Sequence, residues 1–285
     1  MAEPGALMKR AAMASLAVSL FLVTIKVGAY FASHSVAMLA SLMDSALDLF
    51  ASCLNMFAIR HALTPADAEH RFGHGKAEPL AGLAQGAFIS GSALFLVIQV
   101  VQRIVTPEPL DNSIPALAVM SVSILATIFL VHYQRRVVAQ TGSLAVEADS
   151  AHYAGDIITN LGVILALILA SWWSLADPLI ALGVAGVMVW TAWGVGRRSL
   201  DQLMDHELPE EDRMRIRRIA ESHTAVRNVH DLKTRTAGLS IFIQLHLALD
   251  PRMSLAEAHG VSEAVEQALR NAYPGAEVII HQDPN

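Results

Sequence analysis

The chain has 285 residues, of which 54% are hydrophobic and only 16% are charged. A soluble globular domain carries about a quarter charged residues, so the composition excludes a wholly soluble protein. Acidic residues number 26 against 20 basic ones, and no basic stripe with interleaved aromatic residues occurs, so we expect no nucleic-acid partner. The single cysteine, Cys53, excludes a disulfide framework and a multi-thiolate metal site within one chain.

The first two thirds of the sequence contain six long segments that are nearly free of charge. Each segment reaches, or nearly reaches, the roughly 20 residues that a helix needs to cross a bilayer. We therefore predict a polytopic α-helical membrane protein with six transmembrane helices surrounded by membrane lipids. The segments are 11–32, 35–59, 79–102, 113–131, 157–175 and 178–196.

Basic residues indicate how the predicted helices are oriented. Lysines and arginines of short membrane loops concentrate on the cytoplasmic side, and nearly all of them fall on the side that holds both ends of a six-span chain. We therefore predict that both termini are cytoplasmic. Lys26 interrupts the first apolar segment, and we expect its amine to snorkel to the membrane surface.

Residues 201–285 have the character of a soluble domain, because acids outnumber bases and no long apolar run occurs. We divide the chain into a transmembrane domain, 1–200, and a cytoplasmic domain, 201–285. Periodicity predicts a helix, two strands, a second helix and a last strand in the cytoplasmic domain. Ser254 is the expected N-cap of the second helix, and Ala237-Gly238 marks a hairpin. This order fits a small α+β domain of the ferredoxin-like type.

Three carboxylates and a histidine lie in or beside the apolar segments. Asp44 and Asp48 are four residues apart, and His152 and Asp156 repeat that spacing, so each pair shares one helix face. An ionised carboxylate at mid-bilayer costs about 2.5–3.5 kcal/mol on insertion scales, so these residues need a cation or protons. One nitrogen and three oxygens suit Zn²⁺, with Cd²⁺, Fe²⁺ and Mn²⁺ as competitors. A watery crevice without a ligand is the alternative.

The depth of the second pair depends on where the fifth helix begins. Its strictly apolar part starts only at Ile157, which would leave His152 near the membrane boundary. A helix that begins near Ser143 would move the pair inward, and the sequence leaves both possibilities open.

Two further groups of potential ligands lie outside the predicted spans. Asp67, His70 and His74 fall within one short cytoplasmic loop, for which a solvated histidine-rich loop is the alternative. In the tail, His281 and Asp283 are two residues apart and point to the same face of an extended strand. Three other tail histidines could reach the same region, with ordinary surface histidines as the alternative: His230, His246 and His259.

Four motifs carry a resemblance to a known family: DSALD in the second span, HYAGD in the fifth, FGHGKAE after the second and HQDP at the end. Together they resemble the cation diffusion facilitator family, and specifically its bacterial zinc/iron-efflux pumps. The resemblance implies a homodimeric antiporter of the cytoplasmic (inner) membrane. Such a protein exports a divalent cation, with Zn²⁺ expected ahead of Cd²⁺ or Fe²⁺, and takes up protons as the counter-ion.

The resemblance also implies a role for each group. The intramembrane residues match the transport site, and the loop residues match a less well defined metal site. The tail residues match a two-metal site near the dimer contact, at which Zn²⁺ has a structural or regulatory role: His230, His246, His259, His281 and Asp283.

Two other functional classes fit the sequence less well. An enzyme is not expected, because no HExxH, GxSxG or P-loop motif occurs. A metal-sensing membrane protein that binds but does not transport metal is the alternative function. The intramembrane ligands argue against it, because a simple membrane anchor would not bear their energetic cost.

Overall fold

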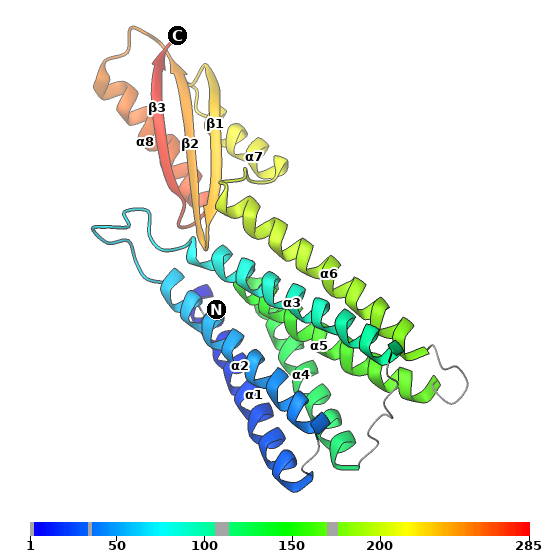
Figure 1. Cartoon of the computed structure of the whole chain (residues 1–285). Coiled ribbons are helices and arrows are strands. Elements are labelled where there is room, and N and C mark those ends of the chain that lie inside the picture. The colour runs from blue at the N-terminus through cyan, green and yellow to red at the C-terminus, as the bar shows by residue number, and fades with distance from the viewer. Residues whose placement is uncertain (1–2, 34–35, 106–113, 170–175) are drawn as a thin grey trace. The chain divides into compact units, whose positions relative to one another are not determined.

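The computed structural model describes residues 3–33, 36–105, 114–169 and 176–285 (Figure 1). The chain forms two compact units, Met1–Leu200 and Asp201–Asn285, and each has its own core. The ends of the predicted apolar segments at residue 35, residue 113 and residues 170–175 lie outside the described residues.

Six long helices account for most of the described residues of the first unit (Figure 1). Five of these described helices are long and apolar enough to cross a membrane, and α5 is not among them. α5 is the helix that carries Glu147, Asp149 and Asp156. The helices are α1 Pro4–Ser33, α2 Val36–Ala62, α3 Ala77–Val105, α4 Ile114–Thr141, α5 Leu144–Leu169 and α6 Ala176–Leu203.

Many large apolar side chains of this unit point outward, and small residues lie at contacts between helices. Trp190 on α6 is 81% exposed, and Phe57 on α2 is also exposed. A Cβ atom at Gly82 of α3 would collide with Ser199 Oγ of α6, so glycine permits the close approach of these helices. Small residues at helix contacts and large ones facing outward are typical of helices packed within lipid.

A buried polar cluster fastens α5 to its neighbours. Asp149 on α5 is 1% exposed and accepts hydrogen bonds from Gln85 Nε2 of α3 at 3.0 Å and Gln134 Nε2 of α4 at 2.6 Å. The hydroxyls of Ser52 on α2 and Tyr153 on α5 are hydrogen-bonded at 2.7 Å. Polar groups inside a membrane need partners within the protein, and these bonds fix the face of α5 that α2 meets.

The beginning of α5 is set by a carboxylate from another helix. α5 starts at Leu144, and Glu78 of α3, 2% exposed, accepts hydrogen bonds from Ser143 Oγ and from the Ala145 N–H at 3.3 Å. Negative charge at a helix N-terminus is favourable because it complements the helix dipole. The helix therefore takes the earlier of the two starts that the sequence allowed, near Ser143. His152 lies about two turns inside α5.

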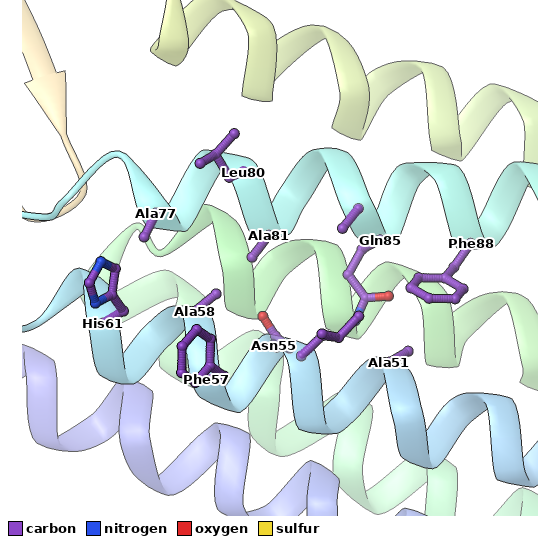
Figure 2. Close-up of a pocket in the computed structure, with 12 residues that line it drawn as sticks. Ala51, Asn55, Phe57, Ala58, His61, Ala77, Leu80, Ala81, Gln85 and Phe88 are labelled. Carbon is purple, nitrogen blue, oxygen red and sulfur yellow. The ribbon is translucent and has the colours of Figure 1, made fainter.

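A groove of about 290 Å³ lies between α2 and α3. Its walls are mostly apolar, and Figure 2 shows the amides of Asn55 and Gln85 within it. At one end, His61 of α2 lies near Ala77, the first residue of α3. The two helix ends that flank the 63–76 loop therefore lie close together.

The second unit follows the predicted order of elements. β1 pairs with β2 antiparallel and β2 pairs with β3 parallel, in the order β1-β2-β3. Apolar residues of the sheet and both helices form one core, with Ile216, Leu245, Leu247 and Leu269 fully buried. The elements are α7 Glu210–Glu221, β1 Asn228–Ala237, β2 Ser240–Leu249, α8 Leu255–Ala272 and β3 Glu277–Pro284.

Two local signals of the tail are confirmed. Ser254 caps α8 in a capping box, because its hydroxyl accepts from the Glu257 N–H while the Glu257 carboxylate accepts from the Ser254 N–H. The hydrogen bond from the Ser254 hydroxyl also lowers the pKa of Glu257. Gly238 has a φ of +59° in the turn between β1 and β2, a conformation that glycine adopts without steric cost.

Candidate metal centres

The structure brings Asp48 of α2 together with His152 and Asp156 of α5. His152 Nε2 lies 3.1 Å from Asp48 Oδ1 and 3.9 Å from Asp156 Oδ2. One ligand atom from each residue lies within 4.8 Å of the others, and His152 is 5% exposed. Zn–N and Zn–O distances of about 2.0–2.2 Å place tetrahedral ligands about 3.3 Å apart, so small side-chain rotations would let these atoms share a metal ion.

Asp44 is the predicted residue that the structure leaves outside this group. It lies one turn before Asp48 on α2, and its side chain is exposed. The spacing of four residues correctly predicted that Asp44 and Asp48 lie on the same side of α2. A fourth ligand from Asp44 would require its carboxylate to turn toward His152.

The expectation that Lys26 snorkels to the membrane surface is wrong. Its Nζ donates hydrogen bonds to Ser45 Oγ at 2.7 Å and to the Ser41 backbone carbonyl at 3.1 Å, both on α2. Ser45 directly follows Asp44, and the carboxylates of Asp44 and Asp48 attract the ammonium group. Polar partners and negative charge inside the bundle thus replace the hydration that snorkelling offers.

The loop residues Asp67, His70 and His74 also form a group with ligand atoms within 4.8 Å of one another. The Asp67 carboxylate accepts the backbone N–H groups of His70 at 2.7 Å and Glu69 at 2.9 Å, and the bond from His70 contributes most to lowering the pKa of Asp67. His74 Nδ1 lies 3.3 Å from the Thr64 carbonyl, and its Nε2 lies 3.4 Å from Asp67 Oδ2. A histidine anchored through Nδ1 presents Nε2 as its ligand atom.

Three tail histidines lie side by side on adjacent strands. His230 is paired with His246 between β1 and β2, and His246 with His281 between β2 and β3. The carboxylate of Asp283 contacts all three imidazoles. Its oxygens lie 3.0 Å from His230 Nε2, 2.9 Å from His246 Nδ1 and 3.2 Å from His281 Nε2. The hydrogen bond from His246 contributes most to lowering the pKa of Asp283, so its carboxylate stays ionised and able to bind a cation.

The structure changes the membership of the tail group. One ligand atom from each of His230, His246 and Asp283 lies within 4.8 Å of the others, and this set does not include His281. His259 on α8 is exposed and lies outside the group formed by His230, His246 and Asp283. Asp231, which the sequence reasoning missed, has its Oδ2 3.5 Å from His246 Nε2. Asp231 has a φ of +46° in a bulge of β1. A bulge interrupts strand alternation, so strict alternation did not indicate that Asp231 and His230 would share this region.

Replacing Asp283 with Asn is expected to weaken zinc binding at the tail group at least about 100-fold, because one carboxylate serves three imidazoles and changes even in residues behind the ligands cost 10–100-fold. Equilibrium dialysis of the full-length protein against buffered zinc would measure the loss. Glu263→Gln, at an exposed acid of α8, is the matched control. Unchanged binding in Asp283→Asn would show that this group is not a metal centre.

Comparison with known proteins decides the family. Residues 12–204 match the cation efflux transmembrane domain, and residues 208–285 match the cytoplasmic domain of cation efflux proteins. The chain belongs to the cation efflux family. The family recognised from the four motifs is thereby confirmed, and cation efflux proteins are membrane-embedded transporters rather than enzymes.

Several cation efflux proteins resemble this chain over nearly their whole length. The cation-efflux pump FieF of Shewanella oneidensis is 47% identical over 279 residues, which cover 97% of this chain and 94% of that protein. FieF of Cronobacter sakazakii is 44% identical over 282 residues, with 98% and 94% covered. FieF of Klebsiella pneumoniae is 44% identical over 283 residues, with 99% and 94% covered.

Proposed function

We propose that this protein exports a divalent transition-metal cation from the cytoplasm in exchange for protons. Zn²⁺ is the first expected substrate, with Cd²⁺ and Fe²⁺ as further ones. The observation that carries the proposal is the approach of Asp48, His152 and Asp156 to within 4.8 Å between two helices of a membrane unit. Nitrogen and carboxylate donors suit zinc, and the FieF relatives are named cation-efflux pumps.

Proton exchange follows from the chemistry of these ligands. A metal ion needs a neutral imidazole and ionised carboxylates, so protons and metal compete for the same atoms. Metal that enters from the cytoplasm would displace protons from His152, Asp48 and Asp156, and Asp44 would join as the fourth ligand. Protons from the outside would then displace the metal. The buried position of His152 supports this coupling, because an unneutralised charge is costly inside a membrane.

We also propose that α5 is a sixth span. Its 26 residues reach about 39 Å, which is enough to cross a hydrocarbon core of about 30 Å, and it packs against α3 and α4. Six spans would place both termini in the cytoplasm of a cell with an inner membrane. The excess of lysine and arginine on that side supports this orientation.

The tail would serve as a cytoplasmic metal-binding domain of the ferredoxin-like type, spanning residues 201–285. The parallel pairing of β2 and β3 across α8 supports this fold. We propose a homodimer that brings two such domains together, with Zn²⁺ held by the tail group regulating or stabilising the pair. The shared carboxylate of Asp283 supports metal binding there.

Zinc movement into proteoliposomes under an imposed proton gradient tests the proposed function. The initial rate, followed with a zinc indicator trapped inside the vesicles, is expected to rise with the pH difference and to fall when an ionophore collapses it. Protein-free vesicles are the control. Zinc movement that ignores the gradient would exclude antiport, and zinc binding without movement would favour the metal sensor.

A further inference from the structure

The loop group of Asp67, His70 and His74 is one ligand short of a closed zinc site. Structural zinc sites are almost always four-coordinate, and a site with three protein ligands keeps a water molecule in the fourth position. His74 is 7% exposed and directs its Nε2 toward Asp67. The open question for this site is whether water or a fourth side chain completes it.

A third imidazole, which would be the fourth ligand, lies next to this group. His61, on the last turn of α2, has its ring centroid 4.6 Å from that of His74, which in turn lies 4.5 Å from the ring of His70. The ring of His74 therefore contacts the rings of both His61 and His70. Figure 2 shows His61 at the end of α2 that faces the start of α3, where the 63–76 loop joins α3.

His61 has room to turn toward the loop. Its side chain is exposed, and its ring stacks on the exposed ring of Phe57 with an interplanar angle of 3°. A rotation that leaves this contact gives up little buried surface, so a metal–nitrogen bond would outweigh its loss. His74 cannot adapt in the same way, because it is buried and its Nδ1 faces the Thr64 carbonyl.

We infer that His61 is the fourth ligand of the loop site, which becomes a closed site of three nitrogens and one oxygen for Zn²⁺ or a similar divalent cation. The inference rests on the proposal that the loop group binds the protein's cation. A closed site would tie the last turn of α2 to the loop. Because α2 also carries Asp48, metal bound at the loop would restrain the helix that supplies a transport ligand.

Cobalt titration of the full-length protein tests this inference. A background variant with Asp48→Ala and Asp283→Ala removes a ligand from each of the other two groups. Four-coordinate Co²⁺ absorbs visible light far more strongly than six-coordinate Co²⁺, so the spectrum reports the number of ligands directly. The background protein is expected to show the strong absorption of a four-coordinate site.

Adding His61→Ala is expected to weaken Co²⁺ and Zn²⁺ binding by about 10–100-fold and to reduce the absorption. His61→Gln, which keeps a polar side chain of similar size, is expected to behave in the same way. His132→Ala, at an exposed histidine of α4, is expected to leave affinity and spectrum unchanged. The melting temperature of each variant without metal separates loss of a ligand from loss of folding.

Equal affinity and equal absorption in the background and both His61 variants would overturn the inference, because water would then complete the site. A background protein that binds no Co²⁺ would overturn it together with the loop site itself. Neither outcome affects the proposed transport function, which zinc flux through the wild-type protein tests separately.

Discussion

Asp48→Asn is expected to lower proton-driven zinc uptake into proteoliposomes at least about 100-fold, because even changes behind a metal ligand cost 10–100-fold. Asp48 Oδ1 is the carboxylate atom nearest His152 Nε2, at 3.1 Å. Asparagine keeps the shape of the side chain and its capacity to meet the imidazole, but it removes the negative charge that a divalent cation needs. The loss of zinc uptake therefore reports the effect of removing the negative charge, and not an effect of altered side-chain packing.

The matched control is Asp177→Asn, which makes the same chemical change in the first turn of α6, outside the intramembrane group. It is expected to transport zinc at nearly the wild-type rate. The initial rate should be measured at several zinc concentrations, with equal amounts of reconstituted protein. Uptake that survives Asp48→Asn would remove the intramembrane group as the transport site and direct attention to the loop and tail groups.

The second large effect is expected on stability. Asp149→Ala should lower the free energy of unfolding by about 2–6 kcal/mol, because it leaves the buried amides of Gln85 and Gln134 without their acceptor and each unpaired donor costs about 1–3 kcal/mol. The two bonds, at 3.0 and 2.6 Å, link α5 to α3 and α4. Titration of the purified protein with SDS in mixed micelles measures the change.

Two further variants provide stability losses with which that of Asp149→Ala can be compared. Asp149→Asn keeps an acceptor oxygen and is expected to lose about half as much stability, whereas Asp177→Ala, at a helix N-terminus, is expected to lose about 1 kcal/mol or less. If Asp149→Ala proved as stable as Asp177→Ala, the polar cluster would not be what fastens α5 to its neighbours. Loss of zinc binding in a folded Asp149→Ala variant would show, in addition, that the cluster positions His152.

Local features of this protein could be predicted from its sequence because they depend on the backbone within a few residues. Helical periodicity relates Asp44 to Asp48, and His152 to Asp156, wherever the helices end up. The capping box at Ser254 is equally local, since one residue and the residue three positions later complete it. The length and polarity of the apolar segments likewise sufficed to indicate a helical membrane domain.

Only the tertiary structure decides which of these local features meet. Asp48 and His152 are separated by 104 positions, and the approach of α2 to α5 depends on packing that no short segment encodes. The same holds for the three-helix cluster around Asp149 and for Lys26, whose amine turns to α2 because carboxylates and a serine lie there.

Irregular backbone conformation is the other feature that the sequence pattern could not predict. The bulge with Asp231 at φ +46° departs from strand alternation, so the pattern did not indicate that Asp231 lies beside His246. His61 lies at a helix end, and its approach to His74 depends on the path of the loop between them. Periodicity thus determined which residues share an element face, whereas packing and loop geometry decided which faces came together.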